Sequence, residues 1–270
     1  MRYVTSSNKY YLDFRNILRY TTLMKKLLFI LFTLNIALFA ETITIAVAAN
    51  VSYAMDEIKA EFVKEHPQIK VRVSLGSSGK LTAQIKNGAP YGLFMSANMK
   101  YPQALFEDKI ATTKPVVYAQ GALAMLSVKP RDLSEGLALL EEPSIKKIAV
   151  ANPKTAPYGI AAKEALQNAG LYEKLKPKFV YGESISQTVS YTVTATEIGI
   201  IAKSSLYSLR MQHFKENVNW TSIDTNLYTP IEQGLVLLKE GRDIKEYQEF
   251  YDFILSKKAQ AIFLKYGYTI

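Results

Sequence analysis

Residues 69–95, IKVRVSLGSSGKLTAQIKNGAPYGLFM, contain one strand–turn–helix–strand unit. Apolar and polar residues alternate over 69–75, which is typical of a strand, and Gly-Ser-Ser-Gly at 76–79 ends it. Apolar residues then recur at helical spacing over 80–86, and the apolar run at 93–95 predicts a buried strand. Strands that alternate with helices through short polar turns indicate an α/β fold whose parallel sheet is covered on both faces.

The same alternation continues along the rest of the chain. It predicts further strands at 41–49, 121–128, 147–150, 179–181, 198–202 and 234–239, and helices at 52–65, 159–169, 186–195 and 244–265. Two such series predict two α/β lobes, residues 41–117 plus 230–270 and residues 118–229, with crossings near 114–121 and 224–234. A ligand cleft is expected between the lobes, where strands end and helices begin.

Composition excludes several classes of protein. Of 270 residues, 49% are hydrophobic and 21% charged, which is typical of a globular chain. The absence of cysteine excludes disulfides, thiol catalysis and cysteine-ligated metals. The net charge is +9, but residues 1–40 contribute +5 of it and the remainder only +4. No basic cluster is interleaved with aromatic residues, so a nucleic-acid partner is not predicted.

The N-terminal region has the pattern of an export signal. Residues 24–40, MKKLLFILFTLNIALFA, combine a short cationic start, an apolar run of 14 residues and a small residue before Glu41. That run is shorter than the roughly 20 residues that a membrane-spanning helix needs. We interpret 24–40 as a signal peptide, 1–23 as an extension upstream of the true start, and 41–270 as a protein exported to the periplasm.

Four strand-to-helix turns share a composition suited to anion binding. Each is small, polar and free of carboxylates; they lie at 48–52, 76–79, 156–159 and 184–186. The first N–H groups of a helix lack partners and carry a partial positive charge, so small turn residues let an anion approach them. Each turn taken alone is also explained by the preference of Ser and Asn for helix N-caps. Together they predict an oxyanion site that uses neither Lys nor Arg.

Several motifs resemble one transport family. IAVAANVSYAMDEI at 45–58, GSSGKLTAQIKNGAPYGLFMSA at 76–97, AVANPKTAPYGIAAKEAL at 149–166 and the segment 247–268 are similar to the periplasmic molybdate-binding proteins of ABC transporters, the ModA type. This resemblance implies a type II periplasmic binding-protein fold, with two lobes of mainly parallel sheets. It also implies a monomer without a cofactor or resident metal, which binds molybdate or tungstate and delivers it to an inner-membrane ABC permease.

The resemblance also implies the ligand residues. They are Asn50, Ser78, Tyr158 and Ile185, the last two acting through their backbone N–H groups. Because Ser78 would donate its hydroxyl to the anion, we predict that Ser78→Ala weakens binding while leaving thermal stability nearly intact.

Two positions depart from the family pattern. A tyrosine whose hydroxyl often reaches the anion falls on Ala202 here, and the acidic residue common before Leu-Phe is replaced by Gly92. The tyrosines that could supply the missing hydroxyl are Tyr118, Tyr181 and Tyr191.

Other functions are weighed by their chemistry. A site made only of donors suits molybdate, tungstate and sulfate, whereas hydrogen phosphate also needs an acceptor, for which Glu183 and Asp56 are the nearest acids. A binding protein for sulfate or another small anion therefore stays open. An enzyme would need a base or a metal, but the only histidines, His66 and His213, lie in polar segments. A binder of acidic polymers would need a basic face, which could only be assembled from Lys80, Lys86, Lys154, Lys163 and Lys203.

Overall fold

A computed structural model describes residues 24–25 and 41–270. The predicted extension, 1–23, and all but Met24 and Lys25 of the predicted signal peptide lie outside the described residues. Residues 41–270 form one compact unit. Within the described residues, no helix combines the length and apolar character required to cross a membrane.

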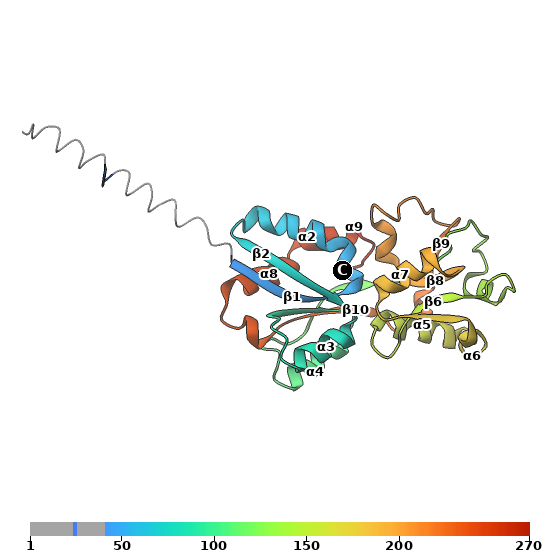
Figure 1. Cartoon of the computed structure of the whole chain (residues 1–270), viewed down its shortest axis with the longest axis horizontal. Helices are drawn as coiled ribbons and strands as arrows, with labels where there is room; N and C mark the ends of the chain where they lie inside the picture. The colour runs from blue at the N-terminus through green and yellow to red at the C-terminus, as the bar shows by residue number, and fades with distance from the viewer. Residues whose placement is uncertain (1–23, 26–40) are drawn as a thin grey trace, which may run out of the picture. The chain divides into compact units, whose positions relative to one another are not determined.

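The first lobe is built on a five-stranded sheet with the order β2-β1-β3-β10-β4. Its strands are β1 (Glu41–Ala48), β2 (Ile69–Gly76), β3 (Leu93–Ser96), β4 (Val116–Gly121) and β10 (Ile231–Leu237). Helices cover both faces (Figure 1): α2 (Ser52–Glu65), α8 (Lys245–Ile254) and α9 (Lys257–Lys265) on one, and α3 (Ser78–Lys86) and α4 (Lys100–Glu107) on the other.

Strand alternation explains why this sheet needs two helical layers. Ile45 and Val47 on β1 are fully buried against α2, α8 and α9, in the cluster that contains Phe62 and Phe250. Ala46, which lies between them in sequence, belongs to the opposite cluster with residues of α3 and α4. Successive side chains of a strand point to opposite faces, so a continuously apolar strand is stable only when both faces are covered.

The second lobe repeats this arrangement with the strand order β7-β6-β8-β5-β9. Its strands are β5 (Leu123–Leu126), β6 (Ile148–Ala151), β7 (Phe179–Gly182), β8 (Ile198–Ala202) and β9 (Trp220–Ser222). α7 (Ile185–Thr194) packs on one side, and α5 (Pro157–Asn168) with the short α6 (Tyr172–Leu175) on the other (Figure 1). The predicted α/β fold with two sheets is therefore confirmed.

The sheets are less parallel than the sequence suggested. β10 runs antiparallel to β3 and β4, and β5 runs antiparallel to β8 and β9. Only the pairs around β1 and β6 are parallel. The reason lies in the crossings, because β5 and β10 enter their sheets from the cleft, where β1, β3 and β6 end. The chain passes between sheets at Ala122 and again between Ser222 and Ile231, so the predicted border at 117/118 falls inside β4.

The C-terminal segment differs from the single helix predicted at 244–265. It forms α8 and α9, separated at Leu255 and Ser256. Ser256 is extended, with φ −73° and ψ 158°, and its hydroxyl accepts the N–H of Ala259 at 3.3 Å. The apolar stripe continues through this break, which is why periodicity alone did not reveal it.

Ser256→Ala tests the contribution of this helix cap. The substitution removes the acceptor for Ala259 N–H and is expected to lower the free energy of unfolding by about 1 kcal/mol. Ser256 lies outside the cavity described below, so ligand affinity should stay unchanged. Chemical denaturation gives the first quantity and calorimetric titration the second; unaltered stability would contradict the capping role.

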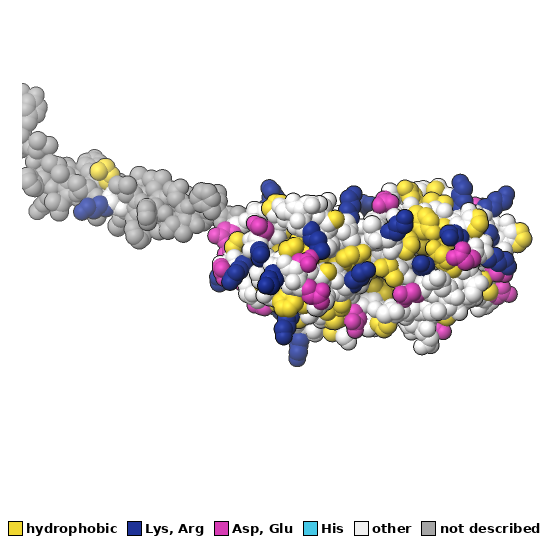
Figure 2. Space-filling model, turned by 90° about the horizontal axis from the view of Figure 1, so that it is seen from below, with side chains coloured by type: hydrophobic (Ala, Val, Ile, Leu, Met, Phe, Trp, Pro, Cys, Tyr) yellow, Lys and Arg dark blue, Asp and Glu magenta, His cyan; other side chains and the backbone are white. Residues whose placement is uncertain are grey.

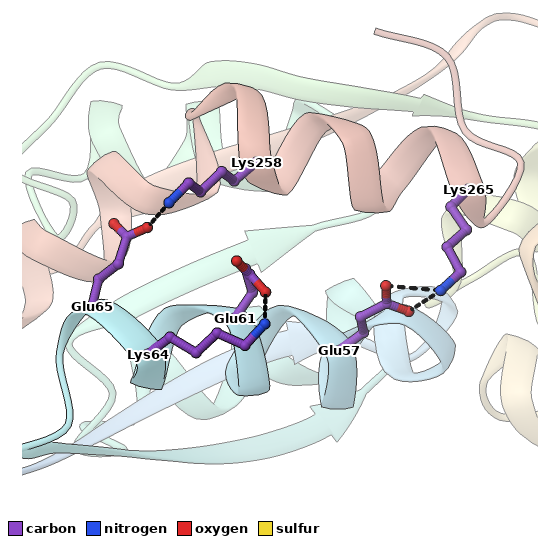
Figure 3. Close-up of polar contacts among 6 residues, drawn as sticks. All are labelled: Glu57, Glu61, Lys64, Glu65, Lys258 and Lys265. Atoms are coloured by element: carbon purple, nitrogen blue, oxygen red, sulfur yellow. Dashed lines mark hydrogen bonds and ion pairs between the residues drawn. The ribbon is translucent and has the colours of Figure 1, made fainter.

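Ion pairs join α9 to α2 (Figure 3). Lys265 Nζ lies 2.7 Å from Glu57 Oε2, and Lys258 pairs with Glu65 at the other end of the same helices. Hydrogen bonds from the lysines to these carboxylates raise the pKa of both lysines. The four side chains are 36–64% exposed, so solvent screens the pairs and they add little stability.

Candidate functional site

The four predicted turns meet in one small cavity between the lobes. It is lined by 48–50, 76–78, Ala97, 156–158 and Ile185, which include all four predicted residues. The cavity volume is about 10 Å³, which is about the space that one water molecule needs. Each turn follows the end of a strand (β1, β2, β6 or β7) and leads into a helix, so helix N-termini from both lobes face one point.

The predicted residues are almost completely buried at this point. Asn50 and Ser78 have 0% of their surface exposed, Tyr158 1% and Ile185 4%. Ser78 and Ile185 open α3 and α7, and Tyr158 is the second residue of α5. N–H groups at these positions have no partner within their helices. The cavity wall therefore presents backbone donors and the positive ends of helix dipoles.

The Ser78 hydroxyl is oriented by the next strand. Its Oγ accepts the N–H of Ala97 at 2.9 Å. A hydroxyl has one hydrogen and two lone pairs, so this bond leaves the Ser78 hydrogen available to donate. Ser78 can thus offer both its N–H and its O–H to an anion.

Asn50 is held by partners that the sequence did not indicate. Its Nδ2 donates to Gln233 Oε1 at 2.7 Å and to the Tyr268 hydroxyl at 2.9 Å. Its carbonyl accepts from Tyr268 at 2.9 Å and from Ser204 at 3.2 Å. Both amide hydrogens are used, so the donor that Asn50 can still offer to a ligand is its backbone N–H, on the short 3-10 helix Ala49–Val51. The sequence held one signal of this support, which is the polar residue Gln233 within the otherwise mostly apolar strand β10.

The tyrosines that could replace the hydroxyl missing at Ala202 do not reach the cavity. None of Tyr118, Tyr181 and Tyr191 lines the cavity, and Ala202 does not line it either. Tyr158 does, and burial raises its pKa well above the usual range, so its hydroxyl stays protonated. That hydroxyl lies at the first crossing, where a Cβ added to Gly121 would be only 2.0 Å from it.

Ionised side chains are absent from the wall of this cavity within the described residues. Glu183 accepts from Asn152 at 3.4 Å, and Asp56 pairs with Lys59 at 3.1 Å. Neither carboxylate lines the cavity, and Gly92, in place of the family's acid, packs against Tyr247 instead. The site as folded therefore suits an anion that only accepts hydrogen bonds.

Hydrogen bonds close the lobes around the cavity. Gly79 N–H donates to the Thr155 carbonyl at 2.9 Å, and the Ser186 hydroxyl donates to the Ala49 carbonyl at 2.9 Å. Ser204 on the second lobe reaches the carbonyl of Asn50 on the first. The structure is thus a closed form, in which opening requires that these bonds between the lobes break.

A larger groove of about 840 Å³ lies beside α2 and α7. Its wall includes Tyr53, Asp56, Arg210 and His213, and it contains none of the four predicted ligand residues. The wall of this groove contains both acidic and basic side chains. The helix N-termini of the four predicted turns lie instead at the small cavity.

The residues considered for other functions lie apart from the cavity. His66 stacks on Phe62 at 4.5 Å and pairs with Glu249 at 3.4 Å, and His213 lies against Phe214. Within the described residues, no three His, Asp or Glu side chains are grouped to hold a metal ion.

Three of the five lysines of the hypothetical basic face each contact a different residue. Lys86 pairs with Asp108, Lys163 lies 5.5 Å from the ring centroid of Tyr172, and Lys203 lies 5.8 Å from that of Trp220. The face seen in Figure 2 likewise mixes basic, acidic and apolar side chains without one extended basic patch.

Comparisons with known proteins bear on the family and the fold. A family model described as bacterial extracellular solute-binding protein matches residues 43–269. The molybdate-binding protein ModA of Azotobacter vinelandii is 35% identical over 234 residues, 86% of this chain and 91% of that protein. ModA of Rhodobacter capsulatus is 35% identical over 83% of this chain and 86% of its own length. The solved periplasmic molybdate-binding protein of A. vinelandii superposes with a TM-score of 0.77 at 30% identity, covering 84% of this chain and 99% of that structure.

Proposed function

The chain belongs to the bacterial extracellular solute-binding proteins and, within them, to the ModA molybdate-binding proteins, and from this premise we propose that it captures molybdate and delivers it to an ABC permease. It is a transport protein and not an enzyme, and molybdate is its cargo, not a cofactor. It acts outside the cytoplasm; the predicted signal at 24–40 supports the periplasm as the compartment. The observation that carries the proposal is the convergence of four helix N-termini on one uncharged cavity.

We propose that Asn50, Ser78, Tyr158 and Ile185 bind the anion. Within each lobe, the helices hold these backbone N–H groups in place, and the bond from Ala97 N–H orients the Ser78 hydroxyl. A hydrogen bond to a charged group contributes about 1.5–3 kcal/mol, so one from each turn gives roughly 6–12 kcal/mol before the desolvation cost is subtracted. That range corresponds to dissociation constants from about tens of micromolar to nanomolar.

Binding and closure are linked because the donors belong to both lobes. Asn50 and Ser78 lie on the first lobe, and Tyr158 and Ile185 on the second. An anion can contact all of them only in the closed form, so it stabilises that form by its differential affinity. The permease then meets a protein whose two lobes are held together by its cargo.

Calorimetric titration of residues 41–270 with molybdate, tungstate, sulfate and phosphate tests this function. Molybdate should bind most tightly together with tungstate, which has the same charge and tetrahedral shape. Sulfate has the same charge and shape but is smaller, so its titration measures the size preference directly. Hydrogen phosphate brings a proton for which the cavity wall offers no carboxylate. A preference for phosphate, or heat from none of the four anions, would overturn the proposal. We further propose that the protein is a monomer, which light scattering of the molybdate complex checks.

Ser78→Ala is expected to weaken molybdate binding by about ten- to a hundredfold, because it removes one hydrogen bond to a charged ligand. The structure changes the expectation for stability, since the same substitution leaves the buried N–H of Ala97 without its acceptor. The free energy of unfolding should therefore also fall, by about 1–3 kcal/mol. Titration and denaturation of the same variant measure both effects. Lower stability with unchanged affinity would restrict Ser78 to a structural role.

A further inference from the structure

Ser77 occupies the N-cap of α3 but does not cap it. Its side chain makes no bond to the backbone of the helix, although serine at this position usually accepts an N–H from the second or third helical residue. The two other serine caps, Ser184 and Ser256, do accept such bonds, each at 3.3 Å. Ser77 is thus an exception within its own chain.

A carbonyl from the other lobe takes one of the two N–H groups that an N-cap side chain usually serves. Gly79, the second residue of α3, donates its N–H to Thr155 O at 2.9 Å. The third residue is Lys80, the position that Ser184 and Ser256 serve in their own helices, and the Ser77 side chain makes no bond there either.

The Ser77 hydroxyl is nevertheless buried and unpaired. Ser77 is 5% exposed, and its Oγ has no hydrogen-bond partner among the described residues. Ser77 also lines the small cavity. Buried hydroxyls without partners are rare in folded proteins, so the Ser77 hydroxyl requires a partner from outside the chain, which is a ligand, an ion or a water molecule.

Two other unpaired atoms on cavity residues do not offer the same possibility. Asn50 Oδ1 is an acceptor, and an anion that only accepts hydrogen bonds cannot use it. The Tyr158 hydroxyl is a donor, but it lies against Gly121 at the crossing between the sheets. Ser77 is adjacent to Ser78 and combines a free hydrogen with a place in the turn that already faces the anion.

We propose that Ser77 is a further ligand of the oxyanion, donating its hydroxyl hydrogen beside that of Ser78. This inference rests on the proposed function and deepens it, because it gives the Gly-Ser-Ser-Gly turn two hydroxyl donors.

Calorimetric titration of Ser77→Ala against wild-type protein tests the inference, with Ser256→Ala as the matched control. Ser77→Ala should raise the molybdate dissociation constant about tenfold, the effect of one hydrogen bond to a charged group. Its unfolding midpoint without ligand should stay near that of the wild type. Ser256→Ala should show the opposite pattern, a lower midpoint with unchanged affinity. Ser77→Cys keeps the shape of the side chain with a weaker donor and should also lose affinity, which covers the case in which alanine perturbs folding.

The outcomes separate the inference from the function on which it rests. Wild-type affinity in both Ser77 variants, with molybdate bound tightly by the wild-type protein, would overturn the role of Ser77 alone. If the wild type prefers sulfate, the proposed cargo is wrong, and the same variants titrated with sulfate decide whether Ser77 binds the anion. If the wild type binds no oxyanion, both proposals fail.

Discussion

Asn50→Asp is expected to reduce molybdate affinity by roughly a thousandfold. Aspartate has nearly the shape of asparagine but places a negative charge in the wall of a cavity meant for a doubly negative anion. One unit charge about 4 Å from another costs about 4 kcal/mol at an effective dielectric constant of about 20, so even one of the anion's two charges accounts for roughly a factor of a thousand. Asn50 is fully buried, so solvent screens little of this repulsion. Calorimetric titration at neutral pH measures the loss.

The pH dependence of this variant gives a second readout. Burial and the bound anion both raise the pKa of the new carboxyl, because both disfavour its charged form. The protonated form binds better, so affinity should recover as the pH falls, whereas the wild type should change little. Asn168→Asp is the matched control, since Asn168 is exposed on α5 and donates to Leu227 O at 2.9 Å, away from the cavity. Equal affinity in the wild type and Asn50→Asp would remove Asn50 from the site.

Gly79→Ala is expected to weaken binding by hindering closure of the lobes. A Cβ at this position would lie 2.9 Å from Thr155 O, which belongs to the backbone of the other lobe, and 2.7 Å from the Tyr101 hydroxyl. The tyrosine can move, but the carbonyl can retreat only if the lobes separate. Overpacking costs about 1–3 kcal/mol, and the lost hydrogen bond adds about 0.5–1.5 kcal/mol, so affinity should fall roughly ten- to a thousandfold.

Small-angle scattering with and without molybdate follows closure in Gly79→Ala directly. The variant should stay more extended than the wild type at the same degree of saturation. Lys80→Ala is a suitable control, because Lys80 is exposed in the same turn and does not line the cavity. Its affinity should remain close to wild type if neutral dipoles bind the anion. A Gly79→Ala variant that closes and binds normally would show that the contact between Gly79 and Thr155 is not needed.

The fold could be predicted because its signals are local. Alternation over 69–75 and the break at 76–79 are visible within one short segment, and each is set by backbone geometry. The direction of β5 and β10 could not be predicted this way, because it depends on where the chain re-enters a sheet. The break at Ser256 was hidden for a related reason, since the apolar stripe required by the core continues across it.

In the site, too, the features set by local sequence could be predicted and those set by distant residues could not. The four turns could be recognised because every helix N-terminus has unpaired N–H groups, and small polar residues mark the turns where an anion can approach them. The support of Asn50 could not, because Gln233 and Tyr268 are 183 and 218 residues away and meet it only through packing. The unpaired hydroxyl of Ser77 could not be predicted either, because its burial in the cavity wall depends on packing between segments that are far apart in the sequence.

The use of peptide N–H groups at Tyr158 and Ile185 has a consequence for how such a receptor evolves. Every amino acid except proline carries the same amide hydrogen, so these positions can drift through many side chains without losing a donor. Selection then acts on the path of the main chain and on the volume that neighbouring side chains leave for the anion. Descendants of this protein could therefore differ at half of their anion contacts in residue identity while presenting an unchanged set of hydrogens.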